Sequence, residues 1–108
     1  MNLYSSLAQG AIQSNYHTLY SVPVGKRANL NSIWIHNNGA DTLYVSVWAK
    51  VKGASIPLIP EQFPLNAAYS AELLDNTPLG LEPGDSIVAR SEDSSSIMFN
   101  INGELGAL

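Results

Sequence analysis

Residues 27–50 read RANLNSIWIHNNGADTLYVSVWAK and contain two strand-like segments on either side of a turn signal. In the second segment, apolar residues that we assign to the core alternate with residues that we assign to the outer face. The first set is Leu43, Val45, Val47 and Ala49, and the second is Tyr44, Ser46, Trp48 and Lys50. An alternation of this kind is typical of a strand with one buried face. The residues between the segments, 38–41, are Asn, Gly, Ala and Asp, which favour a turn. This stretch therefore predicts two β-strands that each contribute one face to a hydrophobic core.

We expect the two segments to pair as a β-hairpin. Ile33 and Ile35 then join the apolar set of the second strand, because residues paired across an antiparallel ladder share a face. Leu30 is out of phase with Ile33, so a β-bulge near residues 31–32 is needed to return it to the core. The alternative register buries Trp34 and needs no bulge.

Three aromatic residues form the candidate interaction site. In the preferred register Trp34, Tyr44 and Trp48 lie on the outer face of the hairpin. Exposed aromatic patches are typical of protein interfaces. We therefore expect a partner protein to cover them, with burial in the core and a sugar-stacking platform as the two alternatives.

The rest of the chain has the same character. Turn signals rich in Gly, Pro, Asn and Asp separate short segments rich in Val, Ile, Leu and Tyr. These segments predict strands at 11–14, 18–22, 27–37, 42–50, 56–59, 69–74, 86–90 and 96–102. One weak helix candidate spans 66–74. A chain of 108 residues is the size of one domain, so we expect a single antiparallel β-sandwich, jelly-roll-like, of about eight short strands.

The N-terminal segment, residues 1–17, has two interpretations. It carries Leu3, Tyr4 and Leu7 among small and polar residues. These three could anchor an arm on a neighbouring subunit, which would order only on docking. Alternatively, residues 11–14 are an integral first strand. In either case residues 18–108 form the sandwich domain.

The composition narrows the classes of partner. Charged residues make up only 13% of the chain, about half of the usual share, and the net charge is −4. A surface poor in charge favours assembly with a protein partner, so we expect a homo-oligomer. The basic residues are few and scattered, which argues against a nucleic-acid partner: Lys26, Arg27, Lys50, Lys52 and Arg90. We find neither a signal peptide nor an apolar run of about 20 residues, so a membrane partner is not expected.

No catalytic or metal-binding motif is present. The chain has no cysteine, and its two histidines, His17 and His36, lack the spacing of a metal site. Gly25 and Lys26 lack the remaining residues of a phosphate-binding loop, because Tyr20 stands where its first glycine should be. The sequence therefore predicts a non-enzymatic protein without a cofactor.

Two stretches carry a family resemblance. Residues 18–28 (TLYSVPVGKRA) lead into 32–37 (SIWIHN), and LGLEPGDSI follows at 79–87. Together they resemble small β-sandwich virion proteins of tailed bacteriophages, over most of residues 18–101. Turns with the pattern Pro-x-Gly and Pro-Gly-Asp suit many sandwiches, so these motifs are only moderately specific.

The resemblance implies a structural role in a virion. It predicts a capsid decoration (cement) protein that stabilises the shell by contacts with itself and with the major capsid or another virion protein. The implied location is the virion, with assembly in the host cytoplasm. A tail, fibre or host-receptor-binding module and a carbohydrate-binding β-sandwich, with a glycan as ligand, are the alternatives.

Overall fold

The computed structural model of the chain describes residues 5–75, 77–93 and 96–107, which form ten β-strands and no helix. The first five strands are β1 (Ser5–Ile12), β2 (His17–Ser21), β3 (Lys26–Asn37), β4 (Leu43–Val51) and β5 (Ala54–Pro57). The other five are β6 (Phe63–Leu65), β7 (Ser70–Glu72), β8 (Leu79–Leu81), β9 (Ser86–Ser91) and β10 (Ile97–Ala107).

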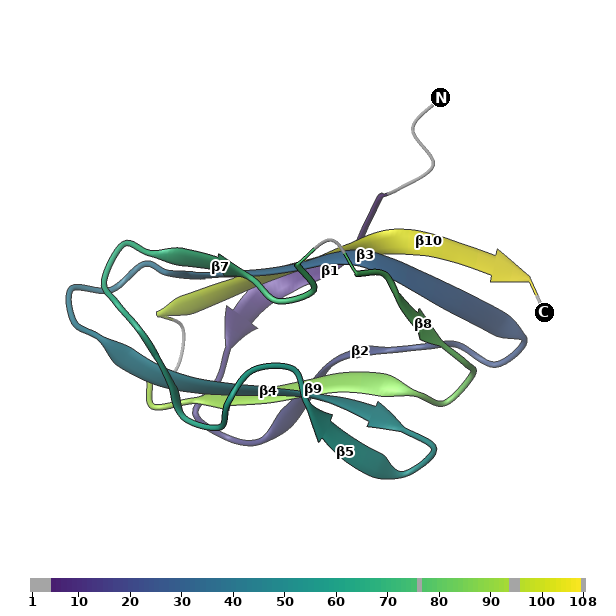
Figure 1. The fold of residues 1–108 in the computed structure, drawn as a ribbon, viewed down its shortest axis with the longest axis horizontal. Helices are drawn as coiled ribbons and strands as arrows, with labels where there is room; N and C mark the ends of the chain where they lie inside the picture. Colours follow the sequence, from purple (N-terminus) through teal and green to yellow (C-terminus); the bar gives the residue numbers. More distant parts are fainter. Residues whose placement is uncertain (1–4, 76, 94–95, 108) are drawn as a thin grey trace.

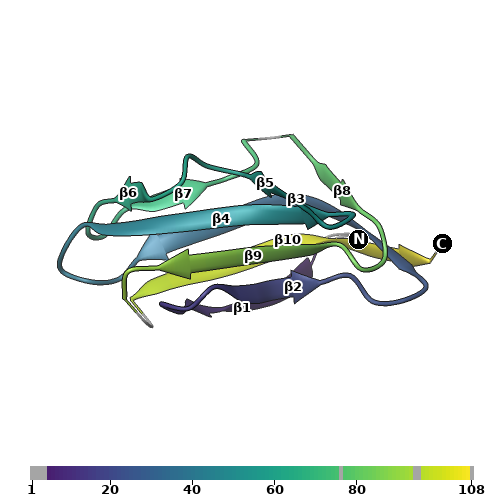
Figure 2. The same cartoon turned by 90° about the horizontal axis from the view of Figure 1, so that it is seen from below.

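The strands form two antiparallel sheets that pack face to face (Figure 1). Sheet A has the order β1-β10-β3-β7, with β8 also paired to β3. Sheet B has the order β2-β9-β4-β5, with β6 also paired to β4, and Figure 2 looks onto this sheet. The predicted all-β sandwich is confirmed. The strands β6 and β8 were not predicted, because each is too short to show an alternating pattern.

The predicted pairing of the two central strands is wrong. β3 pairs with β10, β7 and β8 in sheet A, whereas β4 pairs with β9, β5 and β6 in sheet B. The link at 38–42 therefore crosses from one sheet to the other instead of closing a hairpin. Both strands still present their predicted apolar faces to the core, where Ile33 and Ile35 of one sheet and Val45 and Val47 of the other are buried.

The predicted β-bulge in β3 is confirmed. Along the β3–β10 ladder Ser32 pairs with Asn102 but Leu30 pairs with Gly103, so Asn31 is the extra residue. The shift turns Leu30 inward, and its side chain is fully buried. Trp34 accordingly faces outward, and the alternative register that buries it does not occur.

The N-terminal segment supplies an edge strand. β1 pairs with β10 along sheet A, from Ser5 opposite Gly103 to Ile12 opposite Ile97. Ile12 is fully buried. This arrangement corresponds to the first-strand interpretation, and β1 is longer than the predicted 11–14. The weak helix candidate at 66–74 instead holds a turn and strand β7.

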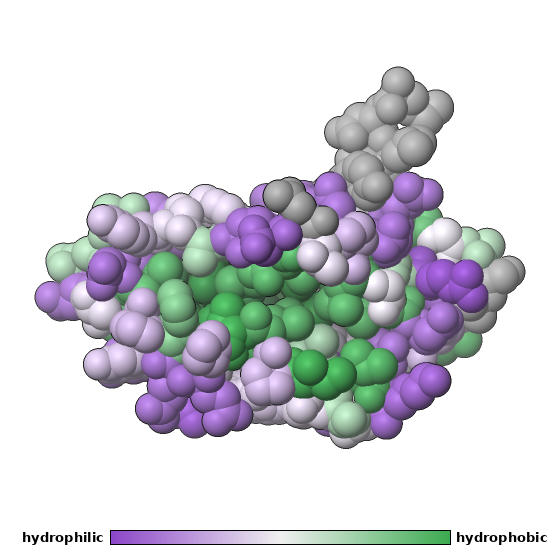
Figure 3. Space-filling view, in the orientation of Figure 1, coloured by the Kyte–Doolittle hydropathy of each residue, from purple (hydrophilic) through white to green (hydrophobic). Residues whose placement is uncertain are grey.

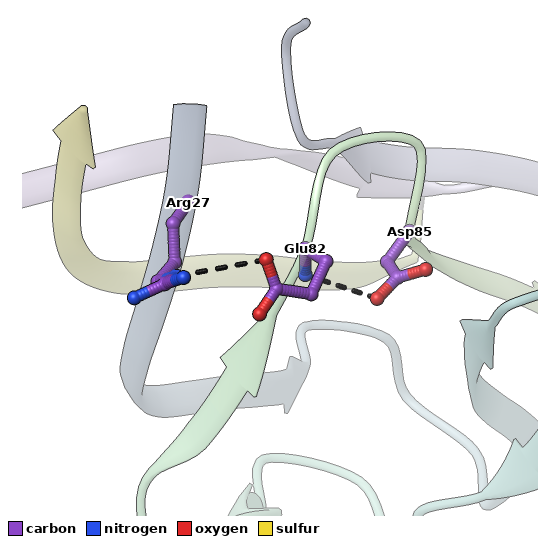
Figure 4. A network of polar contacts seen from close by, with 3 residues as sticks. All are labelled: Arg27, Glu82 and Asp85. Atoms are coloured by element: carbon purple, nitrogen blue, oxygen red, sulfur yellow. Dashed lines mark hydrogen bonds and ion pairs between the residues drawn. The ribbon is translucent and has the colours of Figure 1, made fainter. Parts of the chain in front are cut away.

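One end of the sandwich is held together by a buried carboxylate. Asp85 is 4% exposed and accepts hydrogen bonds from the backbone N–H groups of Lys52 and Glu82, both at 3.0 Å. Its own carbonyl accepts from the N–H of Val22. Three turns thus meet at one residue, which explains the Pro-Gly-Asp sequence before β9. Figure 4 shows the hydrogen bond between Glu82 and Asp85 beside the exposed ion pair between Arg27 and Glu82, at 3.5 Å. An exposed ion pair of this kind adds little stability.

Candidate interaction surfaces

The outer face of sheet A carries the first aromatic surface. Trp34 is 38% exposed, and its ring is stacked on that of His36 with centroids 5.6 Å apart. Met98 lies beside His36 on β10 and is also exposed. The neighbouring Glu72 turns its carboxylate toward the backbone, where it accepts from the N–H groups of Ile33 and Leu74.

The outer face of sheet B carries a groove of about 220 Å³, here called the sheet B groove. Its lining comes from β4, β9 and the two loops beside them: Tyr44, Ser46, Trp48, Glu61, Gln62, Arg90, Ser91 and Glu92. Trp48 is half-buried and makes a tilted ring contact with Tyr16 at 5.4 Å. The Ser46 hydroxyl accepts from the backbone N–H of Gln62 at 2.8 Å, which holds the loop before β6 against β4.

Two carboxylates stand at the rim of this groove in fixed positions. Glu61 Oε1 accepts from the indole Nε1–H of Trp48 at 3.2 Å. Glu92 Oε1 accepts from the backbone N–H of Tyr44 at 2.8 Å, and the Tyr44 carbonyl accepts from the Glu92 N–H. Sequence reasoning connected neither residue with the aromatic surface, because Glu61 is an isolated acid in a loop and Glu92 stands beside Asp93 in a turn-like segment. Only the fold brings them to aromatic residues 13 and 48 positions away.

The predicted interface residues do not form one patch. Trp34 lies on sheet A, whereas Tyr44 and Trp48 lie on the opposite outer face, because β3 and β4 belong to different sheets. All three face outward as predicted. Leu3 and Tyr4 lie outside the described residues. Leu7 packs partly against the core of its own subunit, and its predicted role as an anchor on a neighbour stays a prediction.

One long side of the sandwich leaves apolar residues uncovered. β5, β6, β7 and β8 run along this side (Figure 2), and Figure 3 shows a hydrophobic band between the two sheets there. Ile56 of β5 pairs with the buried Ala49 and so lies on the inner face of its strand, yet it is 49% exposed. Half-buried residues continue this apolar side: Leu58, Ile59, Leu73 and Leu79.

Charged residues are distributed unevenly along the long axis of the sandwich. The turns after β2, β4 and β8 form one end, on the right in Figure 1. Four of the five basic residues lie in or beside these turns, together with Glu82 and Asp85: Lys26, Arg27, Lys50 and Lys52. The β3–β4 and β9–β10 loops meet at the other end, where the Asn38 N–H donates to the Ser96 carbonyl. Asp41, Glu92 and Asp93 lie in these loops. The second end therefore carries acidic side chains, whereas the first, here called the basic end, carries both signs with an excess of basic ones.

The remaining polar groups indicate no metal site. Within residues 5–75, 77–93 and 96–107, no group of three or more acidic or histidine side chains is placed to hold a metal ion. That same part of the chain has no helix long and apolar enough to cross a membrane. Burial raises the pKa of the Tyr20 phenol above its ordinary value of 10.0.

The fold is similar to that of a solved histone-binding protein. The crystal structure of the Drosophila NLP-core, described as giving insight into pentamer formation and histone binding, superposes with a TM-score of 0.51. The match covers 94% of this chain and 98% of the other, at 13% sequence identity. At that identity the likeness shows a shared fold. No family model and no curated protein matches the sequence.

This comparison corrects the function expected from the phage resemblance. The expectation of a bacteriophage capsid decoration protein is contradicted, because the similar structure is a histone-binding core and not a virion protein. The tail-module and carbohydrate-binding alternatives fall with it, and nothing in the comparison supports a capsid partner. The expected location in a virion stays a prediction. The pentamer of the NLP-core agrees with the expected homo-oligomer. The motif resemblance itself stays a prediction.

Proposed function

We propose that this protein is a homo-oligomeric binding protein, a ring of five subunits, that binds basic polypeptides. The observation that carries the proposal is the fold shared with the NLP-core over nearly the whole of both chains, since that protein forms pentamers and binds histones. The net charge of −4 is consistent with a basic ligand. A ring multiplies that charge and repeats each binding site around one axis, which strengthens binding to a long ligand.

The apolar side supports assembly with a second copy of the chain. Ile56 belongs to the inner face of β5 but is left half-exposed, so the core of one subunit is continuous with the surface. Covering such a side removes apolar area from water, which is the main driving force of association. A ring requires an interface between two different patches, and we assign this side as one of them.

The proposed function is tested on the purified full chain. Native mass spectrometry should show a pentamer. Fluorescence anisotropy should show that a labelled oligo-arginine binds and that a labelled oligo-glutamate does not. Binding should weaken as salt rises, because salt screens exposed charges. A strict monomer, or equal binding of both peptides, would contradict the proposal.

The substitution Ile56→Asp should dissociate the oligomer while leaving a folded subunit. A carboxylate at this half-exposed position stays hydrated in the monomer but would be buried without a partner in the interface. Native mass spectrometry should therefore show monomers, and circular dichroism should show an unchanged β spectrum. Val24→Asp is the matched control, because Val24 is 95% exposed in a turn at the basic end. Equal effects of the two substitutions would exclude the apolar side as the interface.

A further inference from the structure

The sheet B groove has the chemistry of a site for one cationic side chain. We propose that it binds a lysine or arginine side chain of a basic polypeptide, an inference that rests on the proposed function and assigns its ligand to a place on the subunit. The groove combines two oriented carboxylates, two aromatic rings and a small volume. No other surface described above brings these three features together.

The carboxylates are held in place before any ligand binds. Glu61 is fixed by the indole of Trp48, and Glu92 is fixed by the backbone of Tyr44. Each of these hydrogen bonds uses Oε1, and within the described part of the chain neither Oε2 takes part in a hydrogen bond. An oriented carboxylate loses little conformational entropy on binding, and a charge-assisted hydrogen bond to a guanidinium or ammonium group is stronger than a neutral one.

The aromatic rings add an attraction for the same kind of group. Trp48 is restrained on one side by Glu61 and on the other by the ring of Tyr16. Tyr44, which is 49% exposed, also lines the groove. The face of a tryptophan or tyrosine ring attracts a cation, and tryptophan does so best. The aliphatic part of a lysine or arginine side chain also packs well on such rings.

The size of the groove favours a side chain over a whole small molecule. Its volume of about 220 Å³ lies below the usual range of drug-sized ligand sites, which begins at about 300 Å³. It opens on the outer face of the sheet, so a polypeptide chain can pass over it and insert one residue. In a cyclic oligomer the equivalent grooves lie on one circle around the axis, so that several residues of a long basic segment could bind at once.

Arg90 allows the sign of the ligand's charge to be tested. It lines the same groove, is exposed, and forms no ion pair within 4.0 Å among the described residues. Its positive charge opposes a cationic ligand and would assist an anionic one. The substitution Arg90→Gln should therefore strengthen the binding of oligo-arginine. Weaker binding by this variant would overturn the proposal.

The central test compares two variants that change the net charge equally. Glu61→Gln with Glu92→Gln keeps an oxygen for each observed hydrogen bond and removes both charges from the groove. Glu82→Gln with Glu104→Gln removes two exposed charges near the basic end. With labelled oligo-arginine, the groove variant should bind about tenfold more weakly, and the control variant should stay within about twofold of the wild type. Native mass spectrometry should show both variants in the wild-type oligomer.

Tryptophan fluorescence can show on which outer face of the subunit the ligand binds. The chain has two tryptophans, one on each outer face, so Trp34→Phe leaves Trp48 as the sole reporter. Oligo-arginine should change its emission at the same concentrations at which anisotropy reports binding. In Trp48→Phe, the remaining Trp34 should report no change. A response of Trp34 without one of Trp48 would place the ligand on sheet A and contradict the proposal.

The outcomes separate this inference from the proposed function. If the wild type binds no oligo-arginine, the proposed function itself fails. If the wild type binds and the two double variants lose affinity equally, diffuse charge attracts the peptide and the groove is not its site. If only the groove variant loses affinity for oligo-arginine and the emission of Trp48 changes on binding, the result supports both the proposed function and the groove as the binding site.

Discussion

Replacing Gly103 by alanine should lower the free energy of unfolding by about 3 kcal/mol or more. A Cβ at this position would lie 2.5 Å from the Asn29 carbonyl oxygen and 2.9 Å from the Leu30 Cα. Both contacts are with backbone atoms in the middle of sheet A, so no side chain can rotate away to relieve them. The β-bulge at Asn31 brings the two strands this close together.

Gly106→Ala is the matched control for this substitution. Gly106 lies on the same strand and pairs with Arg27, but a Cβ there meets nothing within 4 Å. Thermal unfolding by circular dichroism should show a melting temperature lowered by roughly 15 °C for Gly103→Ala and little change for Gly106→Ala. Similar melting temperatures for the two variants would mean that the bulge does not hold the strands at this distance.

Replacing Asn37 by alanine should cost about 3 kcal/mol of stability, because its side chain connects three backbone groups that would lose their partner. Asn37 is fully buried at the end of β3. Its Nδ2 donates to the carbonyl oxygens of Asp41 and Leu65, both at 2.8 Å. Its Oδ1 accepts from the Gly39 N–H at 2.9 Å.

Two further variants separate hydrogen bonding from packing at Asn37. Asn37→Asp keeps the shape and the acceptor oxygen but replaces the amide donor by a charged oxygen facing two carbonyls, so it should destabilise at least as much as alanine. Asn38→Ala removes a neighbouring exposed side chain and should change stability by less than about 0.5 kcal/mol. Urea unfolding of the three variants gives the values. If the Asn37→Asp variant were as stable as the wild type, that result would contradict the assigned hydrogen bonds.

The oligomer and the groove have different physical requirements, which makes them separable in experiments. The proposed assembly uses an apolar side that includes Ile56, and its strength should change little with salt. The proposed binding of a basic segment uses Glu61 and Glu92, and it should weaken as salt rises. A salt titration followed by native mass spectrometry and by anisotropy should therefore release the peptide before the ring dissociates.

Local patterns in the sequence were sufficient for the fold class and for the faces of the long strands. The alternation along 43–50 depends only on the two-residue period of a strand, so it correctly assigned Val45 and Val47 to the core. The out-of-phase position of Leu30 was likewise sufficient to predict the bulge. Pro and Gly separated most of the strands, because their backbone preferences act within a few residues.

Tertiary structure alone decided which strands are neighbours and which residues form a site. The link at 38–42 can close a hairpin or cross between sheets. The choice depends on whether β3 and β4 pair more favourably with β10 and β9, respectively, than with each other. That competition involves residues far apart in the chain, which no local pattern records. It placed Trp34 on a different sheet from Tyr44 and Trp48. It also brought Glu61 and Glu92 to the groove, because the pairing of β4 with β6 and β9 positions the loops that carry them.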